Sequence, residues 1–341
     1  MSSRKVALRL LLSIAIAAGL VWWLLAQGFD VIPSVRAIDG VLAWWAVPAY
    51  GLLFSAFHVL RAWRWRYLID PFAEVRTGTM MSAAFAGFLA IQMMPLRTGE
   101  LARPWLIDRH AGISKSAMLG TVAIERVVDG LVVSLGLTAA LFAVPADAGP
   151  HVWGLRVVPL AVFAFALALL VAFHRRPEPV GRLVRGSVGL FSPRLAGFVS
   201  GALDRFHVGL ACLPHPRSFW AFNAFSAAYW GLNALALWVL ARGCGLDLSA
   251  AGSVAVVGCL AVGILLPAGP GYFGNFQLSV LVALGLYLDV RAEPEAVAVF
   301  VFALYVLQTG LTILFGAGAF LVLWRTPAVR AEERDGAQAM K

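Results

Sequence analysis

The chain has 341 residues, of which 61% are hydrophobic and only 13% are charged, and its mean hydropathy is +0.83. So little charge cannot cover so much apolar side chain in water, which excludes a soluble domain. The formal net charge of +9 comes from arginines beside apolar segments, a pattern that indicates membrane orientation and anionic lipid rather than nucleic-acid binding.

Apolar segments near the length that a helix needs to cross hydrocarbon recur along the whole chain. They predict an all-α polytopic membrane protein with about eight transmembrane helices, forming a single integral membrane domain over residues 1–341. We expect a short polar tail at 325–341. The segments are 7–26, 41–60, 79–95, 118–144, 155–173, 219–241, 250–267, 272–288 and 296–323.

Two arginine-rich segments, 61–76 and the connector 174–218, set the expected orientation. Short loops rich in arginine favour the cytoplasm, so both are predicted to lie there, including Arg61 and Arg64. A full crossing by 79–95 would then place the next charges outside, against the rule. That segment also reaches only about 24 Å as a helix, less than the roughly 30 Å of hydrocarbon. A broken or re-entrant helix resolves both conflicts.

A second segment resembles this one. Residues 82–99 (SAAFAGFLAIQMMPLRTG) and 253–271 (SVAVVGCLAVGILLPAGPG) share Ser, Ala, Gly, Leu-Ala and Pro nearly in register. They predict an internal repeat, in the same or the inverted orientation, with half-repeats at about 41–144 and 219–323. Paired broken segments of this kind indicate a transporter site. Chance similarity between helices rich in Ala, Leu and Val is the alternative.

Three charged residues interrupt the apolar segment 118–144, namely Glu125, Arg126 and Asp129. At 1.5 Å per residue they lie roughly 12 to 18 Å into the bilayer. Charges at that depth cost about 2.5–3.5 kcal/mol each, so they should face protein or a watery cavity. They either line and gate an intramembrane cavity or clasp helices together, and the two hypotheses are compatible.

Arg97, Glu100 and Arg103 follow Pro95 at intervals of three, which places them on one helix face. A planar guanidinium binds phosphate through two parallel hydrogen bonds, so these residues are candidates for lipid-headgroup binding, with Glu100 orienting an arginine. An ordinary cytoplasmic loop is the alternative.

A second set of residues prevents a regular helix near the end of the chain. Backbone that is not helical at membrane depth must be buried in protein or line a cavity, where its N–H groups can bind an anion, and a tight bend between two spans is the other interpretation. This broken-helix motif consists of Pro267, Pro270, Gly271 and Gly274.

Three motifs occur in order: Pro95-x-Arg97-x-Gly99-Glu100-x-x-Arg103, then GISKSAMLGTVAIERVVDG, then Pro267-x-x-Pro270-Gly271-Tyr272-x-Gly274. Over about residues 40–323 the chain thereby resembles the lysylphosphatidylglycerol synthase transmembrane (flippase-like) family. The resemblance implies about eight helices, a pseudo-repeat, binding or movement of a membrane lipid, and the bacterial inner membrane. Asn275 and Gln277 stand where many relatives place a glutamate, so no acidic group is expected from that half.

The basic start and uncleaved first helix predict a cytoplasmic N-terminus. Catalytic motifs are missing and the six histidines lack ligand spacing, so we expect no enzyme activity, no cofactor and no metal. The leading hypothesis is a flippase whose partner is an anionic phospholipid, a polyprenyl phosphate or a hopanoid. The alternative is a non-transporting scaffold that presents lipid to a partner enzyme. A lipid-modifying enzyme with Glu125 or Asp129 as its base is the third hypothesis. Oligomeric state is not indicated.

Overall fold

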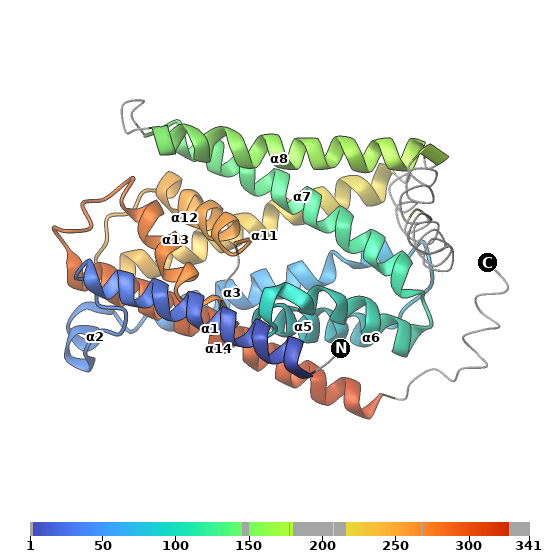
Figure 1. The fold of residues 1–341 in the computed structure, drawn as a ribbon, viewed down its shortest axis with the longest axis horizontal. Helices are drawn as coiled ribbons and strands as arrows, with labels where there is room; N and C mark the ends of the chain where they lie inside the picture. The colour runs from blue at the N-terminus through green and yellow to red at the C-terminus, as the bar shows by residue number, and fades with distance from the viewer. Residues whose placement is uncertain are drawn as a thin grey trace.

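The computed structural model describes residues 3–144, 150–176, 178–179, 207, 216–266 and 269–326, and these contain helices and turns but no strand. Most of the predicted connector 174–218 and of the polar tail 325–341 lies outside the described residues. Long helices run roughly along the long axis of the molecule (Figure 1). They are α1 (Ser3–Ala26), α3 (Ala46–Trp63), α7 (Lys115–Leu141), α8 (Pro150–Arg175), α11 (Pro216–Gly243) and α14 (Pro294–Arg325).

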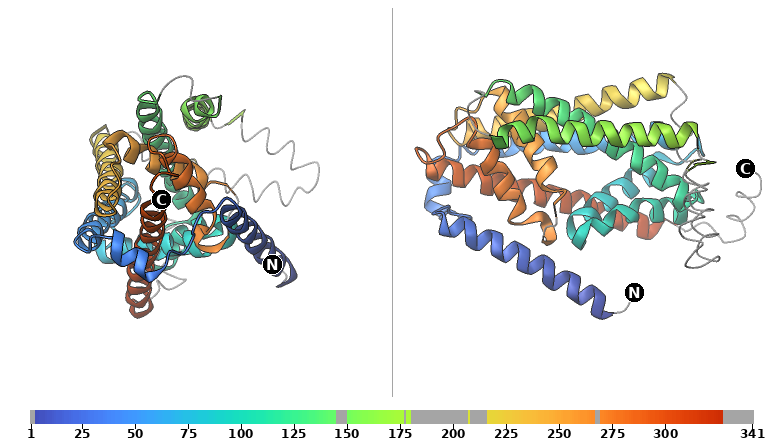
Figure 2. Two further views of the ribbon diagram at one scale, coloured as in Figure 1. Left: turned by 90° about the vertical axis from the view of Figure 1, so that its left-hand side faces the viewer. Right: turned by 45° about the horizontal axis from the view of Figure 1, so that its top comes forward.

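Shorter elements connect or pack between the long helices, while α8 lies at the periphery beside α7 (Figure 2). Two of them are 3-10 helices, η1 (Pro95–Leu101) and η2 (Pro270–Tyr272). The others are α2 (Val35–Val41), α4 (Arg66–Ile69), α5 (Thr77–Met93), α6 (Ala102–Ala111), α12 (Ala250–Gly263) and α13 (Asn275–Leu284).

Three helices in the described part of the chain are long and apolar enough to cross a membrane: Val152–Arg175, Arg217–Gly243 and Pro294–Arg325. Val35–Val41 and Ala46–Ile69, bent by 86° at the break between them, would make a fourth span. The predicted class, an all-helical multi-pass membrane protein, is therefore confirmed. The expected number of about eight spans stays a prediction, because helices such as α7 are long but carry charges.

The two segments predicted to be broken both fold as a helix, a 3-10 helix and a second helix. In each hairpin the flanking helices pack together, α5 on α6 and α12 on α13. Figure 1 shows the two hairpins toward opposite ends of the long axis. Their breaks meet, since the Tyr272 hydroxyl donates a 2.9 Å hydrogen bond to the Ile91 carbonyl near the end of α5. The breaks are thus confirmed, whereas the internal repeat stays a prediction.

Glycine permits the close approach of η1 to α5. A Cβ atom on Gly99 would lie 2.2 Å from the Ala90 carbonyl carbon and oxygen, far inside van der Waals contact. Backbone cannot move aside as a flexible side chain does. Small residues at such crossings are how membrane helices pack closely, so the first hairpin closes only with glycine here.

We expect Gly99→Ala to lower the free energy of unfolding by about 1–3 kcal/mol, the usual cost of overpacking. Gly51→Ala in α3 is the matched control, because its Cβ would meet no atom within 4 Å. Alanine there should leave stability unchanged or raise it by up to about 1 kcal/mol. Thermal unfolding in detergent would measure both. Equal melting temperatures for the two variants would contradict the tight crossing.

Candidate functional site

Glu125 lies in the middle of α7 and is surrounded by arginines. Arg103, at the start of α6, donates from its two terminal nitrogens to the two carboxylate oxygens, at 3.2 and 2.6 Å. Arg126 donates to the same carboxylate at 2.6 Å, and Arg64 lies 3.3 Å from it. Glu125 is only 1% exposed and Arg103 is fully buried. A bidentate pair of this kind is the strongest geometry available to a buried arginine.

Asp129, one turn further along α7, ties this helix to α3 and α11. Arg64, just after α3, donates to its Oδ2 at 2.7 Å and to the Ser226 hydroxyl at 2.6 Å. Tyr229 and Trp230 on α11 donate to Oδ1 at 2.6 and 3.4 Å. Every carboxylate oxygen of the pair Glu125 and Asp129 therefore has a donor. We call Arg64, Arg103, Arg126, Glu125 and Asp129 the arginine–carboxylate clasp.

Aromatic rings stack against the buried guanidinium groups, and one glycine leaves space for one of them. Arg103 stacks over Trp65, with its Cζ 4.6 Å from the ring centroid, and Arg64 lies 4.5 Å over Tyr229. A Cβ on Gly87 would lie 2.0 Å from Cγ of Arg103, so this side chain crosses α5 where there is no Cβ. Cation–π contacts offset part of the desolvation cost of burying these charges.

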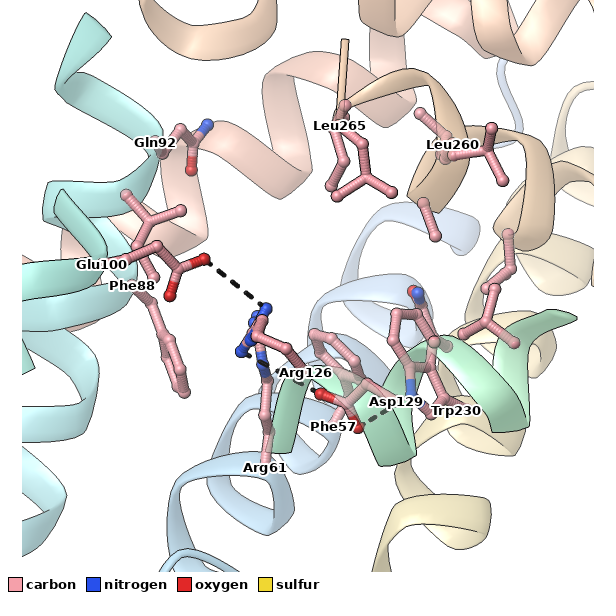
Figure 3. Close-up of a pocket in the computed structure, with 18 of the residues that line it drawn as sticks. Phe57, Arg61, Phe88, Gln92, Glu100, Arg126, Asp129, Trp230, Leu260 and Leu265 are labelled. Carbon is pink, nitrogen blue, oxygen red and sulfur yellow. Dashed lines mark hydrogen bonds and ion pairs between the residues drawn. The ribbon is translucent and has the colours of Figure 1, made fainter. Parts of the chain in front are cut away.

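A cavity of about 650 Å³ lies beside the clasp (Figure 3). Residues from α3, α5, α7, α11, α12 and α14 line it. At one end its wall is charged, formed by Arg61, Glu100, Arg126 and Asp129. Most of the remaining wall is apolar or aromatic. Leu265 belongs to this wall and is also half exposed, which marks where the cavity meets the surface of the protein.

Arg61 and Arg126 are the cations of the charged end. Figure 3 shows their side chains converging, and the two guanidinium groups are close enough to repel each other. Arg126 is compensated by Glu125 and lies 3.8 Å from Glu100. Arg61 stacks over Phe88 at 4.1 Å but makes no ion pair or hydrogen bond with any described side chain. Positive charge therefore remains available to an anion.

The predicted intramembrane residues Glu125, Arg126 and Asp129 are brought together, and Glu100 joins them from η1. Arg103 does not line the cavity; its guanidinium group is buried against Glu125. Arg97 lies in η1, but its side chain is outside the described residues. Headgroup binding by Arg97, Glu100 and Arg103 stays a prediction.

The broken-helix motif is described only in part. Pro267 falls outside the described residues. Pro270 and Gly271 form η2, and Gly274 precedes α13 with a φ of 89°. Gly271 also has a positive φ, 71°, so the non-helical backbone that was predicted here is present. Tyr272, between these glycines, contributes to the cavity wall.

The structure places Arg61 on α3 and Arg64 directly after it rather than in an exposed loop, and the cytoplasmic side of this segment stays a prediction. The helix α3 continues to Trp63, past the end of the predicted span, so Arg61 reaches the cavity and Arg64 is fully buried. The orientation rule counts arginines near apolar segments and does not separate surface residues from buried ones. Their spacing of three on a helix that continues unbroken was the signal that would have found them.

The described residues include no group of three or more His, Cys, Asp or Glu side chains arranged to hold a metal ion. Fold and site together define a polytopic helical membrane protein with a charged cavity next to a buried arginine–carboxylate clasp. The family model described as "Lysylphosphatidylglycerol synthase TM region" matches residues 10–326, and the chain belongs to this family. Comparisons with curated proteins and with solved structures gave no match.

Glu125→Gln should destabilise the protein more than Arg103→Gln. Without Glu125, the guanidinium groups of Arg64, Arg103 and Arg126 remain together in a buried place, whereas without Arg103 the carboxylate keeps two arginines. Losing one partner of a buried pair costs about 3–5 kcal/mol, so the larger effect should lie in that range or above. Melting temperatures in detergent would give the order.

Arg242→Gln is the control for loss of an ion pair, because its pair with Asp247 is exposed. That substitution should cost at most about 1 kcal/mol. The interpretation of Glu125 as the centre of the clasp fails if Arg103→Gln lowers the melting temperature as much as Glu125→Gln.

Proposed function

We propose that this protein binds the phosphate of an anionic phospholipid or isoprenoid lipid in the cavity and moves the lipid across the membrane. The observation that carries the proposal is the convergence of Arg61 and Arg126 at the charged end of an otherwise mostly apolar cavity. Such a wall suits an amphipathic ligand whose anionic end meets the arginines and whose chains meet the apolar side.

The dimensions of the cavity support a headgroup site. Its volume of about 650 Å³ falls within the roughly 300–1,000 Å³ typical of small-molecule sites. A headgroup and the first part of its chains would occupy that volume. The rest of the lipid would leave past Leu265, where the wall reaches the surface. Membership of a family named for a lipid synthase region is consistent with a lipid ligand.

Charge within the site favours an anion. Among the described residues four guanidinium groups, those of Arg61, Arg64, Arg103 and Arg126, face three carboxylates, those of Glu100, Glu125 and Asp129. The excess is one positive charge. Arg64 and Arg103 are engaged in the clasp, which leaves the excess at Arg61 and Arg126 beside the cavity. In this proposal Arg103 positions Glu125, and Glu125 in turn positions Arg126 for the phosphate.

A non-enzymatic role fits the same geometry. Glu125 and Asp129, the candidates for a general base, both have carboxylate oxygens occupied by hydrogen bonds from arginines. We therefore propose binding and transport without chemistry on the lipid, in the bacterial inner membrane with a cytoplasmic N-terminus. A scaffold that presents lipid to a partner enzyme would use the same site without moving the lipid.

Arg61→Gln and Arg126→Gln should each weaken binding of an anionic phospholipid roughly 10- to 100-fold, the equivalent of one charge-assisted hydrogen bond or more. Native mass spectrometry of the purified protein in phosphatidylcholine nanodiscs doped with phosphatidylglycerol would measure the loss. Arg66→Gln is the matched control, because Arg66 is exposed and pairs only with Asp70 among the described acidic residues. If Arg61→Gln and Arg126→Gln retained as much phosphatidylglycerol as Arg66→Gln, the proposed binding site would be ruled out.

Reconstituted vesicles would separate transport from presentation. Wild-type protein should increase the rate at which a fluorescent phosphatidylglycerol analogue crosses the bilayer, and Arg61→Gln should abolish the increase. Lipid binding that depends on Arg61 without any increase in crossing would favour the scaffold instead.

A further inference from the structure

Two neutral polar side chains of the cavity wall are buried without hydrogen-bond partners. His58, on α3, is 2% exposed, and neither of its ring nitrogens is bonded to a described residue. Asn233, on α11, is 7% exposed, and its amide oxygen is likewise unpaired within the described residues. Buried polar atoms in folded proteins are nearly always paired, so these two call for a specific explanation.

The surroundings of His58 offer it no polar partner. Five phenyl rings enclose the imidazole, with centroid distances from 4.8 to 6.2 Å, and they belong to Phe54, Phe57, Phe85, Phe88 and Phe315. His58 also belongs to the cavity wall. Arg61, one turn along α3, already supplies the positive charge. A neutral imidazole adds one donor and one acceptor.

His58 and Asn233 lie on the same side of the charged end. The helices α3 and α11 are antiparallel, since Ala46 packs against Gly243 whereas Arg64 bonds Ser226. Moving one turn back from Arg61 on α3 reaches His58, and moving one turn forward from Trp230 on α11 reaches Asn233. Both steps lead in the same direction from the clasp. The two side chains therefore both lie next to the proposed phosphate position in the cavity wall.

The side chains of His58 and Asn233 favour a lipid headgroup that carries hydroxyl groups. Hydroxyl groups both donate and accept hydrogen bonds, which matches an imidazole and a carboxamide. An amine would need a carboxylate, and all three carboxylates of the site already have an arginine within 4 Å: Glu100 has Arg126, Glu125 has Arg103 and Asp129 has Arg64. We propose that the lipid phosphate is esterified to a neutral, hydroxyl-bearing group, a polyol or a sugar, which His58 and Asn233 recognise. This proposal rests on the proposed function and specifies its substrate class.

Two lipids that differ only in hydroxyl groups would test the proposal. Phosphatidylglycerol and phosphatidylmethanol with identical acyl chains carry the same phosphodiester charge, but only the first has headgroup hydroxyls. Wild-type protein in phosphatidylcholine nanodiscs should bind phosphatidylglycerol about tenfold more tightly, the equivalent of one or two neutral hydrogen bonds. A polyprenyl phosphoryl hexose and the matching polyprenyl methyl phosphate form a second pair, which shows whether the lipid source is glycerol-based or isoprenoid.

Substitutions at the two residues complete the test. His58→Phe, which fits an aromatic enclosure, and Asn233→Leu should each reduce the preference to about threefold or less while leaving phosphatidylmethanol binding unchanged. His58→Gln keeps a donor and an acceptor and should retain part of the preference. Melting temperatures would verify that each variant is folded.

The outcomes separate this inference from the proposed function. Equal binding of both members of each pair by wild type, with Arg61→Gln weakening all of them, would overturn the hydroxyl-bearing headgroup alone. So would an equal loss for both members in His58→Phe. No retention of any anionic lipid above phosphatidylcholine, with no effect of Arg61→Gln, would overturn both proposals.

Discussion

Burial of Glu125 against Arg103 is the interaction on which the rest of the site depends. An isolated charge inside a membrane protein is expensive, and it becomes tolerable only when a partner of opposite charge meets it with good geometry. Here the bidentate contact joins α6 to α7, and the neighbouring pair of Arg64 and Asp129 joins α3 and α11 to the same helix. The clasp thereby fixes the elements that form the charged end of the cavity.

The structural and functional hypotheses for these charges describe two sides of one cluster. On the buried side, Arg64 and Arg103 satisfy the carboxylates and stack on aromatic rings. Arg126 on the other side shares Glu125 with them but also reaches the cavity wall, where Arg61 adds a cation of its own. The clasp contains three arginines but only two carboxylates. Its excess positive charge lies at Arg126, beside the cavity. In the proposed function, the same residues hold helices together and bind the anion.

The sequence was sufficient for features that depend on local spacing. Three charges in an apolar segment predicted an intramembrane cluster, and Pro95 predicted the break after α5. It was insufficient where a contact depends on tertiary structure. Nothing in the spacing of Arg103 shows that its side chain crosses Gly87 to reach Glu125, 22 residues away. Nor does local sequence separate Arg64, buried against α11, from exposed Arg66 two positions later.

For the proposed transport of lipid, the strengths of the contacts predict which part of the molecule would move. The breaks of the two hairpins meet through the neutral hydrogen bond from Tyr272 to Ile91, worth about 0.5–1.5 kcal/mol. Tyr272 also has a φ of 59°, a costly conformation for a residue other than glycine. Breaking a buried ion pair costs about 3–5 kcal/mol. Opening of the cavity should therefore separate the hairpin breaks first, and the clasp, with the arginines that would hold a phosphate, should stay in place while the access route changes.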